Sequence, residues 1–322
     1  MVNVEADAVA GPLLAVRAKR AGVVYSLAYG DQPALICEMV DWARSIGLEI
    51  VCAGKGTKYL PKYHFSTPET VWKYYGLKEE EVVRGGLNSR MFNSFLDGTK
   101  SAIEMAAVAN ATELHPQPEG LKFPSCGVSN LAETCRPRSC GGQLSHSGTV
   151  EVVSSLERNG HPISDDLRWG VYVTFAASNN YVKDCFNEYG LMTDVSGRYS
   201  SLYRPYHLVG LELPISVLKV GLNREATGTP VAFYGDVVAT AKRSLSVKEV
   251  LDGEGGYTVY GKLMPAKNSL KSNALPIGLA RDVVLRKDVP VGQTICWSDV
   301  DYDRANPIIC FRREMELSLI HI

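Results

Sequence analysis

The chain has 322 residues, of which 45% are hydrophobic and 21% are charged, which is typical of a folded protein with two or three domains. Its net charge of −1 lacks the basic excess of nucleic-acid-binding proteins. It has no apolar run of the ~18 residues that a membrane helix needs, and no pattern of a secretory leader. We therefore expect a cytoplasmic protein with reduced thiols, without nucleic-acid or membrane partners.

The first 54 residues alternate between strand and helix patterns. The predicted elements are strands 2–5, 23–30 and 48–54 and helices 10–22 and 33–47. This order predicts an α/β fold with a parallel, Rossmann-type sheet, in which ligands bind beyond the carboxyl ends of the strands. The candidate ligand-binding residues at the first two of these ends are Asn3, Glu5, Gly30, Asp31 and Gln32.

The segment GKGTK, residues 54–58, follows the third predicted strand. Its glycines would let the backbone approach a ligand closely, and Lys55 and Lys58 supply charges suited to phosphate or carboxylate. A solvated surface loop is the alternative. The segment matches neither the dinucleotide-binding glycine pattern nor the P-loop pattern. Its place at a strand end favours substrate binding.

Residues 93–111 predict one long helix that is apolar on most sides. Asn93, Asp97, Lys100 and Glu104 fall on one narrow stripe of it, at i, i+4, i+7 and i+11. Buried charges are tolerated when they are paired or used. One interpretation is an internal ion network that joins Lys100 to Asp97 and Glu104. We favour the other, a catalytic lining in which Lys100 and Asp97 handle protons and Asn93 orients a hydroxyl.

The middle of the chain carries weaker signals. Residues 66–87 predict a capped helix, and residues 148–156 and 170–177 predict strands. Residues 200–222 predict a loop that runs into a helix. The polar side chains at the mouth of that helix are Tyr203, Arg204 and His207. Substrate binding and structural capping both remain open for these three side chains.

From about Pro230 the sequence becomes rich in strands. Residues 280–300 combine a basic and apolar strand, a Val-Pro-Val-Gly turn and a second strand. This pattern resembles the SAF domain, a small β-clip module. Residues 317–322 resemble the translation of a transposon end used in library preparation, and we expect them to be a non-native tail.

Six segments together resemble the deoxyxylulose-phosphate-reductoisomerase-like oxidoreductases, a branch of the homoserine-dehydrogenase-like proteins. They are VNVEADA, AYGDQP, AGKGTKYLP, NSFLDGTKSAIEMAAVAN, YRPYHLVGLE and the SAF-like tail. The resemblance implies the end of an NADP-binding Rossmann domain over 1–48, a catalytic α/β domain over 49–229 and an SAF module over 230–316. Since no glycine-rich half-domain precedes residue 1, we expect a fragment truncated at both ends and inactive alone.

For the family's characterised members, the resemblance implies NADPH-dependent conversion of 1-deoxyxylulose 5-phosphate to methylerythritol phosphate, an isoprenoid precursor. The reaction needs a retro-aldol and aldol shift, then reduction, with cations at the developing oxyanions and an acid/base group. The partner would be a small phosphorylated or acidic polyol. Because orthodox reductoisomerases use a divalent metal, the resemblance also implies Mg²⁺ or Mn²⁺ as a cofactor, although the sequence identifies no ligands for it. The sequence leaves open whether the protein forms a homo-oligomer.

Two alternatives remain at this stage. The first is an oxidoreductase of the same fold acting on homoserine or a sugar acid. The second is a non-catalytic, sugar-binding SAF protein. The resemblance also implies that the first group of candidate residues, from Asn3 to Gln32, binds the cofactor.

Overall fold

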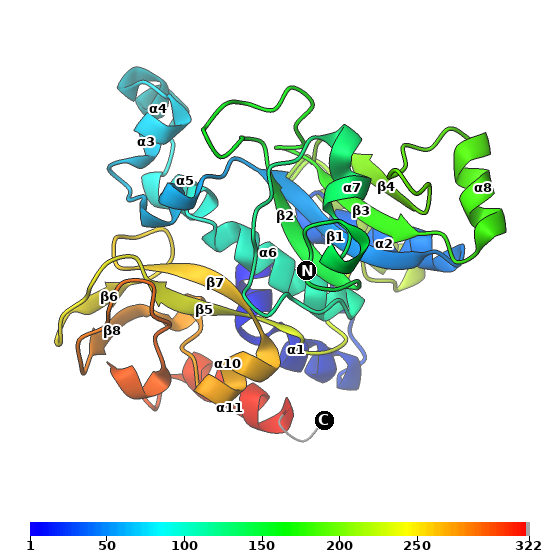
Figure 1. Ribbon diagram of the computed structural model, residues 1–322. Coiled ribbons are helices and arrows are strands. Elements are labelled where there is room, and N and C mark those ends of the chain that lie inside the picture. The colour runs from blue at the N-terminus through cyan, green and yellow to red at the C-terminus, as the bar shows by residue number, and fades with distance from the viewer. Residues whose placement is uncertain (320–322) are drawn as a thin grey trace.

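A mixed four-stranded sheet forms one side of the molecule in the computed structural model, which describes residues 1–319 (Figure 1). The strand order is β2-β1-β3-β4. The strands are β1 (Glu49–Thr57), β2 (Thr149–Ser154), β3 (Val171–Ala176) and β4 (Tyr199–Arg204). β1 pairs in parallel with β2, but β1 with β3 and β3 with β4 are antiparallel. The protein is thus α/β as predicted, but its sheet is not the parallel Rossmann type.

The first 48 residues differ most from the prediction. They form α1 (Val4–Arg20) and α2 (Gln32–Ser45), and in place of the predicted strands 2–5 and 23–30 there are only isolated bridges. The helix starts early because the Asn3 side chain accepts a hydrogen bond from the Ala6 N–H and caps α1. The Leu27 N–H donates to the Gly228 carbonyl and not to a neighbouring strand. The prediction of the second helix and of β1 is confirmed.

The predicted long helix is broken in two. α5 (Ser89–Leu96) ends at Asp97, and α6 (Thr99–Thr112) begins after Gly98, whose φ is 89°. Glycine adopts this left-handed conformation without the steric cost that a side chain would add. α6 is buried and contacts α1, α2, β2, β5 and β7, so it lies between the two halves of the molecule.

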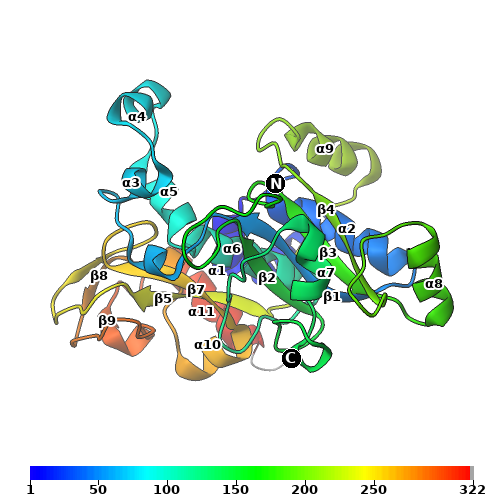
Figure 2. The same ribbon diagram turned by 45° about the horizontal axis from the view of Figure 1, so that its top comes forward.

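The chain also forms several short helices. They are α3 (Val71–Tyr75), α4 (Glu79–Gly85), α7 (Leu131–Thr134), α8 (Asn180–Glu188) and α9 (Leu213–Leu218). The predicted helix over 66–87 is therefore two helices, separated at Gly76 with φ 72°. The predicted loop at residue 200 is the strand β4, and α9 projects from the surface beyond it (Figure 2).

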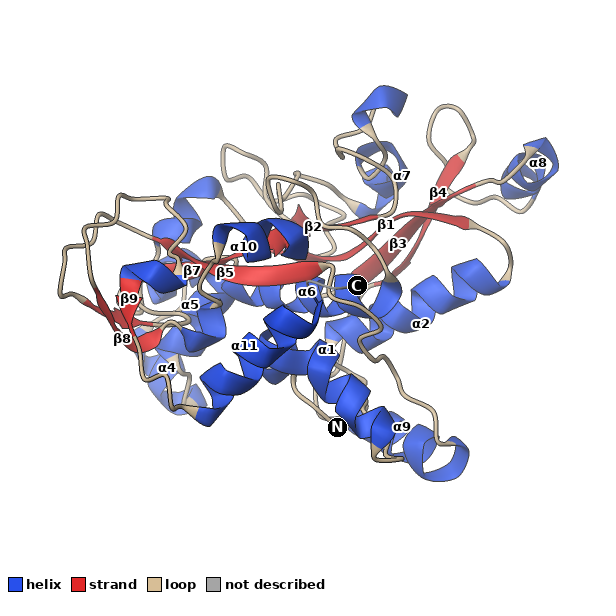
Figure 3. Cartoon of the chain, turned by 90° about the horizontal axis from the view of Figure 1, so that it is seen from below, coloured by secondary structure: helices blue, strands red, loops and turns tan. Residues whose placement is uncertain are grey.

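The strand-rich C-terminal part is confirmed. β5 (Gly235–Ala241) pairs with β7 (Val259–Pro265), while β6 (Val250–Asp252), β8 (Arg281–Leu285) and β9 (Val300–Asp301) form another sheet. α10 (Ala266–Ser272) follows β7, and α11 (Pro307–Leu319) packs across α1 (Figure 3). The SAF assignment remains a prediction.

The predicted non-native tail falls partly within α11. Leu317 is 63% exposed, and Ser318 bonds only to its own helix at the Met315 carbonyl. Residues 320–322 lie outside the described residues.

Candidate functional site

A cavity of about 380 Å³ lies where the starts of α1, α2 and α6 meet the carboxyl end of β1. Residues from α5 and from the loops at 168–169 and 207–209 complete its wall. Eight of the predicted site residues line it: Glu5, Asp31, Gln32, Lys55, Lys58, Lys100, Glu104 and His207. Segments that are far apart in sequence thus converge on one space, which we call the polar cavity for its charged side chains, although aromatic side chains of α5 and Trp169 form much of its wall.

Two ion pairs form the inner end of this cavity. Lys55 on β1 pairs with Glu104 on α6, and both side chains are buried. Lys100 pairs with Glu5 at 2.5 Å. Burial lowers the pKa of Lys100, but Glu104, Asp31 and Glu5 outweigh that effect and raise this pKa above its ordinary value. Lys100 is therefore a permanent cation at neutral pH, held among carboxylates.

Asp31 occupies the same end of the cavity, at the N-cap of α2. Its Oδ1 accepts the Gln32 N–H at 3.0 Å. Burial and the charge of Glu104 raise the pKa of Asp31, while Lys100 and Lys55 oppose the shift. The Gln32 side chain donates to the Gly170 carbonyl at 3.4 Å, which ties α2 to the start of β3.

The outer end of the cavity carries two cations, Lys58 and Arg168. Neither forms an ion pair with any residue between 1 and 319. Lys58 donates to the Tyr74 carbonyl at 2.5 Å, and Arg168 lies 4.6 Å from the centre of the Trp169 ring. Burial, and then the charge of Arg168, lower the pKa of Lys58. Both cations lie 5.7 Å from the Tyr75 ring centre.

Sequence reasoning missed Arg168 because no motif surrounds it. The available signal was its place beside Trp169, directly before the buried strand β3, a combination that also occurs in ordinary turns. His207, which was predicted, reaches the same rim and hydrogen-bonds through Nδ1 to the Trp169 carbonyl at 2.7 Å.

Asn93 and Asp97 lie elsewhere, because the turn at Gly98 splits the predicted stripe. Asn93 is fully buried and donates to the carbonyls of Ser66 and Gly255. Asp97 pairs with Lys242 at 2.7 Å, with both side chains buried. The alternative interpretation, an ion network that joins Lys100 to Asp97 and Glu104, does not describe the observed ion pairs, in which Asp97 pairs with Lys242, Lys100 with Glu5, and Glu104 with Lys55.

The remaining predicted residues do not line the cavity. Asn3 caps α1, and Gly30 packs so closely that an added Cβ would lie 2.7 Å from the Leu208 carbonyl oxygen. Arg204 pairs with Glu212, the N-cap residue of α9. Tyr203 packs against the buried cluster around Tyr172. For Arg204, the placement favours capping of the next helix over ligand binding.

The glycines of GKGTK have a packing role that the sequence did not predict. An added Cβ would lie 1.8 Å from the Glu151 oxygen at Gly54, and 1.9 Å from the Leu167 oxygen at Gly56. They allow β1 to approach its neighbouring strands and loops closely, and Gly56 also lines the cavity. Lys55 correspondingly lies on the strand and is 7% exposed, not on a solvated loop.

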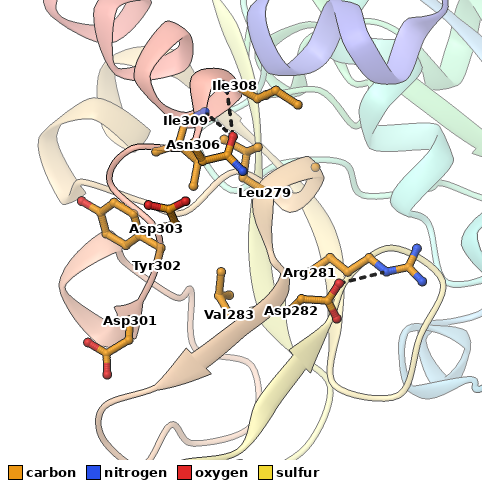
Figure 4. Close-up of a pocket in the computed structure, with 11 residues that line it drawn as sticks. Leu279, Arg281, Asp282, Val283, Asp301, Tyr302, Asp303, Asn306, Ile308 and Ile309 are labelled. Carbon is orange, nitrogen blue, oxygen red and sulfur yellow. Dashed lines mark hydrogen bonds and ion pairs between the residues drawn. The ribbon is translucent and has the colours of Figure 1, made fainter.

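Two larger cavities lie beside α11. One, of about 680 Å³, is mostly apolar, runs between α1 and α11, and shares Glu5 with the polar cavity. The other, of about 560 Å³, is lined by Arg281, Asp301 and Asp303 among others and contains none of the predicted site residues (Figure 4).

The described part of the chain, residues 1–319, contains neither a metal-binding cluster nor a membrane-spanning helix. Residues 1–319 contain no group of three or more His, Cys, Asp or Glu side chains that could hold a metal ion. Within the same range, no helix is long and apolar enough to cross a membrane.

Comparison with known families matches residues 30–213 to the family described as "Oxidoreductase DRL, catalytic domain". No curated protein matches the chain. The matched range contains β1 to β4, α6 and most of the residues that line the polar cavity. With more than half of its length matched, the chain belongs to the DRL oxidoreductase family.

Proposed function

We propose that the polar cavity is the active site of an NADPH-dependent reductoisomerase that converts 1-deoxyxylulose 5-phosphate to methylerythritol phosphate. The observation that carries this proposal is the division of charge along the cavity. Its inner end holds Lys100, Lys55 and three carboxylates, whereas its outer end holds Lys58 and Arg168, which have no carboxylate partner among residues 1–319. A short polyol with a phosphate at one end matches this division.

The outer end suits the phosphate. Lys58 and Arg168 share the aromatic wall at Tyr75. Two cations without carboxylate partners favour a dianion over a singly charged carboxylate, because each supplies a charge-assisted hydrogen bond. This end of the cavity therefore supports a sugar phosphate more strongly than homoserine or a sugar acid.

The inner end suits the carbon skeleton. In a retro-aldol cleavage, the carbonyl oxygen of the ketone becomes an enolate and needs a fixed cation nearby. The Lys100 ammonium is held by Glu5 and has further N–H groups to donate to that oxygen. Lys55 is already engaged by Glu104, and we assign this pair to positioning α6 against β1.

NADPH, when bound, supplies the hydride that reduces the rearranged aldehyde. The apolar cavity between α1 and α11 fits its nicotinamide ring, because it meets the polar cavity at Glu5. Ala6, Val9 and Ala10 of α1 would hold the ring there. The carboxylates of the cavity do not fit a divalent metal, because two of them, Glu5 and Glu104, already form ion pairs with lysines.

The test is a substrate screen on the full-length protein, followed through the loss of NADPH absorbance. The proposal expects turnover with 1-deoxyxylulose 5-phosphate and none with homoserine or sugar acids. Turnover confined to one of the unphosphorylated substrates would replace it with the corresponding dehydrogenase reaction. Sugar binding without any NADPH oxidation would favour a non-catalytic protein.

A further inference from the structure

We propose that Asp31 is the group that takes a proton from the substrate hydroxyl and returns it during the carbon-skeleton shift. The inference rests on the proposed function, because it assigns a role within that reaction. It replaces the sequence-based expectation that Asp31 binds the cofactor.

Among the three carboxylates at the inner end of the cavity, Asp31 is the one without a lysine partner in the described part of the chain. Glu104 is paired with Lys55, and Glu5 is paired with Lys100. Asp31 uses Oδ1 for the N-cap bond to Gln32, and its Oδ2 accepts no hydrogen bond from any residue between 1 and 319. A carboxylate oxygen without a protein partner, on a residue that lines the cavity, is available to a substrate hydroxyl.

The charges that face Asp31 suit this role. Glu104 and Lys100 approach it from α6, Lys55 approaches it from β1, and its own helix contributes the Gln32 N–H. Burial and Glu104 raise the pKa of Asp31 toward the working pH, and the two lysines limit the rise. A base is most effective when its pKa is near the working pH but it is still mostly ionised.

The proton transfer balances as follows. The Asp31 carboxylate takes the proton of the hydroxyl at the β-carbon, and the O–H electron pair forms the new aldehyde C=O. The bond between the α- and β-carbons breaks, and its electron pair moves to the ketone oxygen, which becomes an enolate beside Lys100. For the skeleton to shift, the proton of the α-hydroxyl moves to the former ketone oxygen, which leaves the negative charge on the α-oxygen. The former ketone carbon then bonds to the aldehyde carbon with the C=C electron pair, the α-carbon and its oxygen become the new aldehyde, and the resulting alkoxide takes the proton back from Asp31. The isomerisation thus neither gains nor loses a proton.

The substitution Asp31→Asn separates this role from the structural one. Asparagine is as good an N-cap as aspartate, so the bond from the Gln32 N–H and the start of α2 are preserved. The amide cannot accept a full proton. We expect turnover to fall by roughly 10²–10⁴-fold, the range typical of a lost acid/base group. Asp41→Asn, the same change on an exposed position of the same helix, is the matched control and should leave turnover unchanged.

The measurement is the pH dependence of kcat for the full-length wild-type, Asp31→Asn and Asp41→Asn proteins, beside their thermal melts. The proposal expects the acidic limb of the wild-type profile to vanish in Asp31→Asn alone, with its melting temperature kept. Turnover within about two-fold of wild type, with the acidic limb intact, would overturn it.

Failure of the wild-type protein to turn over any candidate substrate would instead count against the proposed function. In that case the ¹³C signal of the Asp31 carboxyl decides the inference separately. Titration above the ordinary aspartate value of about 3.9 would support an acid/base residue, and titration at or below it would overturn the inference.

Discussion

At the scale of single residues, Lys58 and Arg168 are cations without a carboxylate partner among residues 1–319, and this points to an anionic ligand. Most buried or half-buried cations of this protein have a carboxylate, as Lys55, Lys100, Arg136, Lys242 and Arg312 do. Lys58 and Arg168 have aromatic rings and one carbonyl instead. Desolvating cations without a counter-charge is unfavourable unless a ligand supplies one. We therefore predict that these two side chains bind the anionic group.

Lys58→Met and Arg168→Met should each lower kcat/KM for 1-deoxyxylulose 5-phosphate. A lost charge-assisted hydrogen bond corresponds to about 1.5–3 kcal/mol of transition-state binding, which is a factor of roughly ten to one hundred and fifty. Stability should change little, since exposed or half-exposed cations contribute little to it. Arg158→Met is the control, because Arg158 also lies near an aromatic ring, Tyr59, but not at the cavity. Equal effects of all three substitutions would contradict the assignment.

Asp7 gives a second residue-scale prediction, for stability. Burial raises the pKa of Asp7 to about 7, although the hydrogen bond from Tyr25 lowers it, and its Oδ2 has no hydrogen-bond partner among residues 1–319. Because the folded-state pKa is above the unfolded value of about 3.9, the fold favours the protonated form. The stabilisation is complete below about pH 4 and is lost as the pH rises through about 7.

Asp7→Asn should therefore flatten the pH dependence of the free energy of unfolding between about pH 4 and pH 7. Denaturant melts across this range measure it. The exposed Asp282 provides the control substitution, Asp282→Asn. A wild-type protein whose stability falls no faster with pH than that of Asp7→Asn would show that Asp7 is ionised in the fold.

At the scale of elements, the turn between α5 and α6 decides which side chains meet. The spacing of Asn93, Asp97, Lys100 and Glu104 places them on one stripe only if the helix is continuous. Gly98 in the left-handed conformation turns the chain, so Asn93 and Asp97 bond toward the β5–β7 part and Lys100 and Glu104 line the cavity. Periodicity cannot reveal such a break, because glycine is also tolerated inside helices at a cost of about 1 kcal/mol.

Gly98→Ala tests this turn. The left-handed backbone costs a non-glycine residue about 1–2 kcal/mol, and the new Cβ would meet the rings of His64 and Phe123 at 3.3 Å. We expect lower stability and, because α6 carries Lys100, lower activity. Gly76→Ala is the matched control, since Gly76 has a φ of 72° but no atom within 4 Å of an added Cβ. It should lose stability without losing activity.

At the scale of the whole molecule, the sequence predicted the regular elements of the sheet and the strand-rich C-terminal part. β1, β2, β3 and α2 lie close to their predicted ranges because each has an uninterrupted apolar pattern. The topology was not predictable in the same way. Antiparallel pairing of β1 with β3 joins residues more than one hundred positions apart, and local patterns carry no information about such pairings.

The residues of the candidate site were predictable in part, because local patterns show where strands and helices begin and end. Residues at element ends, such as Asp31 and Lys55, could be identified as candidates, and the fold does bring them together. Their partners could not be identified, because each ion pair joins two separate segments. Lys242, which pairs with Asp97, comes from β-rich sequence with no feature that indicates a buried charge.

In this protein, Lys100 is proposed to serve the active site, whereas Lys242 serves the fold. Lys242 and Asp97 are both buried, so Lys242→Met should strand a buried carboxylate and cost ~3–5 kcal/mol of stability, with turnover per folded molecule retained. Glu5, the partner of Lys100, is 39% exposed in its side chain, so Lys100→Met should cost less stability. Its turnover should fall by roughly 10²–10⁴-fold.

The deciding measurement is turnover per folded molecule of Lys100→Met and Lys242→Met in the full-length protein, with a denaturant melt of each. We predict an inactive but stable Lys100→Met protein and an active but destabilised Lys242→Met protein. A Lys100→Met protein that unfolds easily yet keeps full turnover in its folded fraction would contradict this prediction.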